Sequence, residues 1–223
     1  MSSVLQRAAR GATTNGQTLA LAGNTAQPST MVVTITHNGA TVTLTDSQSN
    51  TYTSTGYVSI GGGIAVEFYT APVATSAALT ITVAVSGGNV THVQAAEVSG
   101  LAVSPWVTPI SSASTGSGTS HAVGPVTPPT DGSFLSYVIY VDATGSITPP
   151  TSFTENLDAS GYYFADFIQT TAAAITPTAT NGGAPTFGYV YLGVFKGAAA
   201  AGAAHALANS SPLASLVNGG LVS

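Results

Sequence analysis

Hydrophobic and polar side chains alternate along much of this chain with a period of two residues, the period at which a β-strand separates its two faces. Residues 31–36 read M-V-V-T-I-T, residues 40–45 place Val42 and Leu44 between threonines, and residues 79–85 alternate aliphatic side chains with threonine and alanine. Glycine and proline clusters separate these runs, and the 3.6-residue period of an amphipathic helix is hard to find between them. The pattern therefore predicts an all-β protein.

Turn signals and the apolar runs together predict how these strands pack. Asn38-Gly39 lies between the first two runs and suits a tight hairpin, because both residues tolerate the positive φ of a primed turn. Residues 134–141, 162–169 and 187–195 are apolar or aromatic on both alternating faces, which predicts central strands covered on both sides. Many short strands favour an antiparallel two-sheet β-sandwich, and we expect a jelly-roll or Greek-key topology.

The chain of 223 residues is long enough for one large domain with additional arms. We predict an N-terminal arm over residues 1–27, a β-sandwich over residues 28–196 and an alanine-rich C-terminal arm over residues 197–223. Both arms lie outside the strand pattern, so we expect them to fray or to become ordered on a neighbouring molecule. Residues 111–130 indicate a surface loop or a short edge strand. The alternative, a linker between two domains, is disfavoured because each half holds too few strands to close a sandwich.

Composition excludes several classes of function. Only 5% of the residues are charged and the net charge is -5, so the basic surface needed for nucleic acids is missing. Without cysteine, disulfides, thiolate metal sites and a cysteine nucleophile are excluded. No apolar run is long enough for a signal-peptide core or a spanning helix, so we expect no membrane anchor.

The residues that carry catalytic chemistry are scattered along the sequence. The acids stand singly except for Glu155 and Asp158, the four histidines lack ligand spacing, and neither a G-x-S-x-G elbow nor a Walker loop occurs. We therefore expect no enzyme, cofactor or metal. The two catalytic carboxylates of a glycosidase have no fixed spacing in the sequence, so this one class of enzyme is not excluded by the pattern. Asp46 and Asp131 read as turn formers. The alternation places Glu97 on the inward side of its run, unless a bulge turns it outward. If it lies inward it needs hydrogen-bond partners, and a structural role is favoured.

The scarcity of charge also bears on association. Monomeric β-proteins protect their sheet edges with lysine, inward charges or proline, yet no lysine or arginine occurs between Arg10 and Lys196. Burial in a symmetric assembly provides the same protection. We therefore expect a homo-oligomer or a lattice-bound structural protein.

Six residues are candidates for contact with a partner. Arginines of the N-terminal arm suit acids on a partner, although plain solvation is the more common role of such arginines. Leucines of the C-terminal arm are candidates because that arm lies outside the strand pattern. The single tryptophan, flanked by prolines, suits the sandwich edge, a subunit contact or a sugar-stacking platform. The candidates are Arg7, Arg10, Trp106, Lys196, Leu213 and Leu216.

Three segments carry a resemblance to a known family. Residues 43–53 read T-L-T-D-S-Q-S-N-T-Y-T, residues 64–69 read I-A-V-E-F-Y and residues 95–100 read A-A-E-V-S-G. Over residues 31–195 the chain resembles a jelly-roll or β-sandwich module recurrent in structural proteins of tailed bacteriophages, with similar modules in bacterial surface proteins. The resemblance implies a capsid decoration, a head fibre or a tail appendage, and binding rather than catalysis. It transfers no functional residues.

The composition, the strand pattern and the resemblance lead to one expected function and two alternatives. We expect a non-enzymatic virion structural protein, a capsid decoration or cement protein assembled in the host cytoplasm and held on the capsid surface by its arms. Its partners are then the major capsid protein, other virion subunits and further copies of itself. A receptor-binding protein of a tail or fibre is one alternative. A secreted carbohydrate-binding module is the other, and it predicts exposed aromatic residues in a row. Tyr189 and Tyr191 are either such a row or part of the core.

Overall fold

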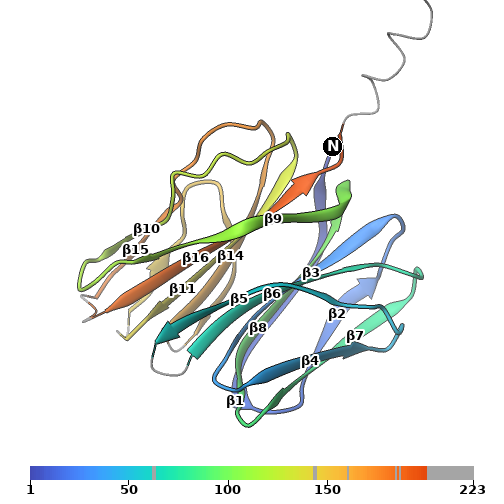
Figure 1. Cartoon of the computed structure of the whole chain (residues 1–223), viewed down its shortest axis with the longest axis horizontal. Coiled ribbons are helices and arrows are strands. Elements are labelled where there is room, and N and C mark those ends of the chain that lie inside the picture. Colours follow the sequence, from blue (N-terminus) through green and yellow to red (C-terminus); the bar gives the residue numbers. More distant parts are fainter. Residues whose placement is uncertain (62–63, 143–144, 160, 184, 186, 200–223) are drawn as a thin grey trace, which may run out of the picture.

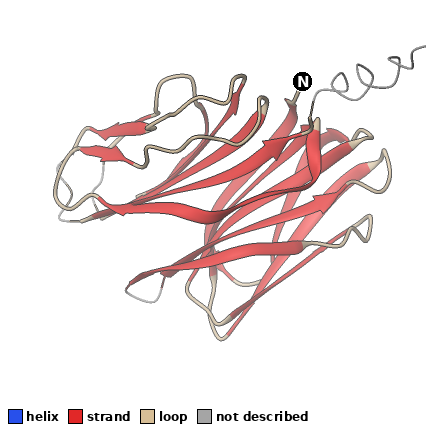
Figure 2. Ribbon diagram, turned by 45° about the horizontal axis from the view of Figure 1, so that its top comes forward, coloured by secondary structure: helices blue, strands red, loops and turns tan. Residues whose placement is uncertain are grey.

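The computed structural model describes residues 1–61, 64–142, 145–159, 161–183, 185 and 187–199. Figure 2 shows the described chain as strands and loops, without a helix in this part. All strand pairs within its sheets are antiparallel. The prediction of an all-β, antiparallel fold is confirmed.

The first half of the chain closes a sandwich of its own from eight strands. A five-stranded sheet in the order β1-β8-β3-β6-β5 faces a three-stranded sheet in the order β2-β7-β4. The inward side chains of β7, including Leu79, Ile81 and Val83, alternate with more exposed ones and fill the core between these sheets. The strands are β1 (Ser3–Thr14), β2 (Gln17–Asn24), β3 (Ser29–His37), β4 (Thr41–Asp46), β5 (Thr53–Gly61), β6 (Ile64–Pro72), β7 (Ala78–Ser86) and β8 (Val90–Ser99).

The second half closes another sandwich, again from eight strands. A five-stranded sheet in the order β13-β14-β11-β16-β9 faces a three-stranded sheet in the order β10-β15-β12. A separate core that includes Leu135, Tyr137 and Tyr163 lies between them. The strands are β9 (Leu101–Ser114), β10 (Ser120–Ala122), β11 (Ser133–Val141), β12 (Ile147–Thr148), β13 (Thr154–Ala159), β14 (Tyr162–Gln169), β15 (Thr178–Asn181) and β16 (Gly188–Gly197).

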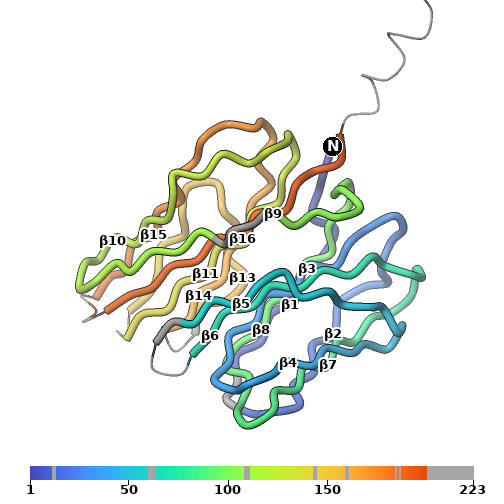
Figure 3. The backbone as a smooth tube through the Cα atoms, in the orientation of Figure 1, coloured from blue at the N-terminus to red at the C-terminus, as the bar shows by residue number. Residues whose placement is uncertain are grey.

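The two sandwiches pack against each other through their five-stranded sheets, so the molecule has four layers (Figures 1 and 3). A third core, with Phe68 of β6 and Phe134 of β11 among its members, fills this interface. Strands β11, β14 and β16 are therefore covered on both faces, as their sequences predict. The single sandwich predicted over residues 28–196 is two sandwiches, because each half of the chain does hold enough strands.

Gly100 alone separates β8 from β9 and connects the two sandwiches. Its φ of 70° lies in the left-handed region, and a Cβ atom there would lie 2.9 Å from the carbonyl oxygen of Met1. The boundary between the halves thus lies before residues 111–130. That segment instead supplies the end of β9 and the short edge strand β10, which agrees with the edge-strand prediction.

Residues 1–27 do not form an arm, because most of them belong to β1 and β2. Strand β1 pairs with β8 at the edge of the first five-stranded sheet. This strand lacks the usual alternation of apolar and polar residues. Arg7 faces the second half of the chain, and the small Ala8 packs on the core of the first half. Of the predicted C-terminal arm, Gly197 ends β16, and residues 200–223 lie outside the described part of the chain.

The outer strands of both five-stranded sheets share one irregularity. Strands β1, β5, β9 and β13 each show a register shift against their neighbour, the signature of a β-bulge. Bulges bend and twist an edge and hinder its pairing with another strand. These bulges give the outer strands a protection against edge-to-edge pairing that does not require burial in an assembly.

Candidate functional site

The motif that carries the family resemblance holds a loop in place. Asp46, at the end of β4, accepts hydrogen bonds from the backbone N–H groups of Gln48 and Asn50. It also accepts bonds from the Asn50 amide and from the hydroxyl of Tyr52, each at 2.8 Å. Asn50 in turn accepts the N–H of Ala74. The predicted turn role of Asp46 is confirmed, and the motif positions no reactive group.

Glu97 of β8 is fully buried, and its carboxylate accepts three hydrogen bonds. Gln6 donates at 2.5 Å, the backbone N–H of Ala26 at 2.6 Å and the hydroxyl of Ser29 at 2.7 Å. These hydrogen bonds satisfy the buried carboxylate and hold β1, β3 and β8 together. The structural interpretation of Glu97 is confirmed.

A charged pair lies inside the interface between the two sandwiches. Arg7 donates through Nε at 2.8 Å and through Nη2 at 2.6 Å to the two carboxylate oxygens of Asp166, which is fully buried. Asn156 bridges Asp166 to Gln94 with bonds of 2.7 and 3.1 Å. For Arg7 the sequence leaves open an acid on a partner or plain solvation, and in the structure Arg7 pairs with an acid of its own chain. Arg10 is exposed and donates to the carbonyl oxygen of Thr18.

His92 lies in the same interface and stacks on Tyr162, with 4.1 Å between the ring centroids. Its Nδ1 atom is buried and has no hydrogen-bond partner among the described residues. Burial lowers the pKa of His92 to about 4, because the charged imidazolium would lose its hydration there. Burial also lowers the pKa values of His37 and His121. These histidines are therefore neutral packing groups at neutral pH.

We expect the free energy of unfolding to fall as the pH falls from 6.5 towards 4. The unfolded chain binds a proton at His92 near pH 6.5 and the folded chain only near pH 4, so acid favours unfolding. For His92 the loss amounts to roughly 2–3 kcal/mol at the acid end of this window. Urea unfolding of the wild type and of His92→Phe at several pH values measures it. Equal pH dependence in the two proteins would contradict the assignment to His92.

The closest approach to a catalytic arrangement lies on β3 and β6. His37 Nε2, fully buried and without a hydrogen-bond partner among the described residues, lies 3.9 Å from the carboxylate of Glu67, which accepts the hydroxyl of Tyr69. Burial and Glu67 raise the pKa of Tyr69 well above its ordinary value. The described part of the chain has no group of three acidic, histidine or cysteine side chains placed to hold a metal. This cluster therefore offers neither a metal site nor an activated nucleophile.

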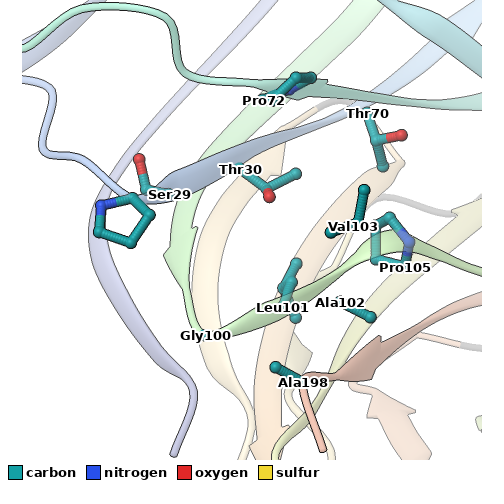
Figure 4. Close-up of a pocket in the computed structure, with 11 residues that line it drawn as sticks. Ser29, Thr30, Thr70, Pro72, Gly100, Leu101, Ala102, Val103, Pro105 and Ala198 are labelled. Carbon is teal, nitrogen blue, oxygen red and sulfur yellow. The ribbon is translucent and has the colours of Figure 1, made fainter.

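An apolar cleft of about 360 Å³ opens between the two sandwiches, where β9 begins (Figure 4). One wall carries Thr30 of β3 and Pro72 of β6, and the other carries Leu101 and Val103 of β9. The lining contains hydroxyl groups but no ionisable side chain. The cleft therefore offers apolar contacts and hydroxyl groups. Its lining residues are Pro28, Ser29, Thr30, Thr70, Pro72, Gly100, Leu101, Ala102, Val103, Pro105 and Ala198.

Val103 projects from a bulge at this cleft. Phe195 pairs with Trp106 and Gly197 with Leu101, so residues 102–105 have no paired positions on β16. The Val103 side chain is fully exposed, with a relative accessibility of 105%. A large exposed aliphatic group beside an apolar cleft is a feature of contact surfaces.

Both ends of the described chain lie at one end of the molecule (Figure 1). Ala198, next to the last described residue, lines this cleft. A second cleft, of about 390 Å³, is lined by Met1, residues 130–132, Thr170, Ala198 and Ala199. Ala198 lines both clefts, so the two are neighbours. We call the surface formed by these two clefts and residues 101–105 the terminal pole.

The other predicted contact residues separate into three groups. Trp106 stacks on Phe68 and packs against Phe195, so its ring belongs mainly to the interface between the sandwiches. Lys196 is half-buried on β16, and Leu213 and Leu216 lie outside the described residues. Of the aromatic residues proposed for sugar binding, Tyr191 is 2% exposed and Tyr189 half-buried, so Tyr191 cannot present its ring to a glycan. The cleft around Val103 was not predicted from the sequence, because a pairing bulge has no signature there. The partner of Arg7 was not predicted either, because Asp166 is distant in the chain.

Comparisons with known proteins add no assignment. No family model matches the chain, and no curated protein or solved structure matches it. Within the residues that the structure describes, no helix is long and apolar enough to cross a bilayer.

Proposed function

We propose that this protein is a non-enzymatic structural subunit of a tailed-bacteriophage virion, a capsid decoration or cement protein that attaches through its terminal pole. The observation that carries the proposal is the apolar cleft at the start of β9 with the exposed Val103 beside it. The resemblance of residues 43–53, 64–69 and 95–100 to phage structural modules supports the setting. The proposed partners are the major capsid protein, other virion subunits and further copies of this chain.

The chemistry of the polar residues supports binding rather than catalysis. Asp46, Glu97 and Asp166 each accept several hydrogen bonds from their own chain, and His92 lies buried against a tyrosine ring. A general acid or base needs access to a substrate proton. The terminal pole, in contrast, has hydroxyl groups and apolar surface on its first cleft and a single carboxylate, Asp131, on its second. Asp131 accepts the backbone N–H of Ala172, which is a structural bond.

Electron microscopy of virus particles that contain the protein, labelled with an antibody against this chain, tests the proposed role. Regular labelling over the shell is the expected result. Labelling confined to the tail tip would replace the decoration role with receptor binding. Absence from every particle, together with binding in a glycan panel, would favour a secreted carbohydrate-binding module.

We expect Val103→Glu to weaken attachment to the partner at least tenfold without a change in stability. A carboxylate at the mouth of an apolar cleft loses its hydration on binding, whereas in the free protein it stays in water. Co-sedimentation of purified protein with particles stripped of it measures the attachment, and urea unfolding measures the stability. Thr18→Glu, an exposed position on β2, serves as the matched control. Equal attachment of the Val103 and Thr18 variants would contradict the role of the cleft.

A further inference from the structure

The two sandwiches repeat one strand order. Adding eight to each strand number of the sheet β1-β8-β3-β6-β5 gives β9-β16-β11-β14-β13, which is the second five-stranded sheet read from its other edge. The same addition converts β2-β7-β4 into β10-β15-β12. Each half is therefore one copy of the same eight-stranded module, and Gly100 joins them. We call them the N-module, residues 1–99, and the C-module, residues 101–199.

Strand pairing identifies equivalent residues in the two modules. Thr34 on β3 and Ser136 on β11 share a hydrogen bond of 2.9 Å across the interface, and each lies on the central strand of its sheet. Their partners on the neighbouring strands are therefore equivalent as well. The equivalent pairs are Thr34 and Ser136, Gln94 and Gly193, and Phe68 and Asp166.

Pairing with the edge strands β1 and β9 identifies one further pair of equivalent residues, which lies in the interface. On β8, Ala96 pairs with Val32 of β3 and with Arg7 of β1. On β16, Phe195 pairs with Phe134 of β11 and with Trp106 of β9. Arg7 and Trp106 therefore occupy equivalent positions on equivalent strands.

Contacts across the interface are reciprocal, as in a two-fold symmetric dimer. Strand β1 packs on β13, and the equivalent β9 packs on the equivalent β5. Arg7 binds Asp166, and its equivalent Trp106 stacks on Phe68, the equivalent of Asp166. The modules thus form a pseudo-symmetric pair within one chain.

The two equivalent sides of this interface carry opposite chemistry. One side holds a charged pair, Arg7 with Asp166, linked through Asn156 to Gln94. The other side is aromatic, and its glycine leaves room for a ring, since a Cβ atom on Gly193 would lie 2.7 Å from Phe68. Each module therefore presents the chemistry that complements the other module.

We propose that Arg7, Asp166, Trp106 and Phe68 make the interface between the five-stranded sheets a selective pairing surface, on which an N-module accepts only a C-module, from its own chain or from a second copy. In a pair of N-modules, each Arg7 would face Phe68 with no carboxylate. In a pair of C-modules, each Asp166 would face Trp106 with no cation. The pair of C-modules is disfavoured more strongly, because its two Asp166 carboxylates are fully buried without a cation. The pair of N-modules loses the hydrogen bonds of both Arg7 side chains, which are 32% exposed in the native interface. The surface acts independently of the contact role of the terminal pole.

Two full-length variants test this selectivity by complementation. Both carry a flexible insertion of about 20 Gly and Ser residues after Gly100, which spans on the order of 25 Å and allows the modules to exchange between chains. One variant has Arg7→Leu, which leaves Asp166 unpaired, and the other has Asp166→Leu, which leaves Arg7 unpaired. In an exchanged pair of these chains, the two introduced leucines meet in one interface and Arg7 meets Asp166 in the other, so both defects disappear.

The expected result is a 1:1 complex of twice the monomer mass when the two variants are unfolded, mixed and refolded. Each variant alone, and the otherwise unchanged chain with the insertion, should remain monomeric in light scattering after gel filtration. The chain with both Arg7→Leu and Asp166→Leu should be a monomer and regain most of the urea midpoint lost by the single variants. A mixture without the heterodimer, homodimers of either single variant, or a double variant as unstable as the single ones would overturn the proposal.

Discussion

Arg7→Leu is expected to lower the free energy of unfolding at neutral pH by about 3–5 kcal/mol, the usual cost of removing one partner from a buried ion pair. The Asp166 carboxylate is fully buried, and the substitution leaves it with the Asn156 amide as the only remaining side-chain donor in the described network. Leucine fills part of the space of the arginine stem but offers no hydrogen bond. Urea unfolding followed by tryptophan fluorescence measures the effect, because Trp106 lies in the same interface.

The unequal burial of Arg7 and Asp166 allows a direct test of this prediction. The Arg7 side chain is 32% exposed and that of Asp166 is 0% exposed, so an unpaired arginine can still reach water. Asp166→Asn should therefore cost less than Arg7→Leu. Arg10→Leu, at an exposed position on the same strand, should change stability by less than about 0.5 kcal/mol. A larger loss for Asp166→Asn than for Arg7→Leu would contradict the burial argument.

The sequence predicts strands well where one face is aliphatic and the other is polar. Leu79, Ile81 and Val83 identify β7, and the apolar runs from Phe134 and Tyr162 identify the central strands β11 and β14. These strands are recognisable because burial on one face or on both leaves a local pattern. Asp46 and Glu97 are likewise predictable, since a turn aspartate and a buried carboxylate both follow from their neighbours in the chain.

Arrangements that depend on distant residues leave no such pattern. Arg7 and Asp166 are separated by 159 positions, so neither residue alone indicates that an arginine in a presumed arm lies inside an interface. The repeated strand order is hidden for the same reason, because equivalent positions need only pack and carry arginine in one module and tryptophan in the other. The boundary between the modules is also not recognisable, because a single glycine, Gly100, does not have the composition of a linker. The terminal pole arises from a bulge, which the register of β9 on β16 determines.

The aromatic side of the interface is expected to be as important for stability as the charged side. Phe68→Ala should lower the free energy of unfolding by about 3–5 kcal/mol, because it removes a fully buried ring and leaves a cavity. The ring lies 5.9 Å from the centroid of Trp106 and 6.1 Å from that of Phe195. Thermal and urea unfolding measure the loss, and Phe187→Ala, at a 36% exposed ring, is the control that should cost far less.

The equivalence of Gly193 with Gln94 adds a test of why this ring fits. Gly193→Ala should cost about 1–3 kcal/mol, since the new methyl group would lie within 2.7 Å of the Phe68 ring and packed cores tolerate extra volume poorly. If steric contact is the cause, the smaller side chain of Phe68→Leu should relieve it, and the double variant should be more stable than the two separate losses predict. Strictly additive losses would instead place the cost of Gly193→Ala in the backbone of β16. In that case the glycine would be required by its strand and not by the module that faces it.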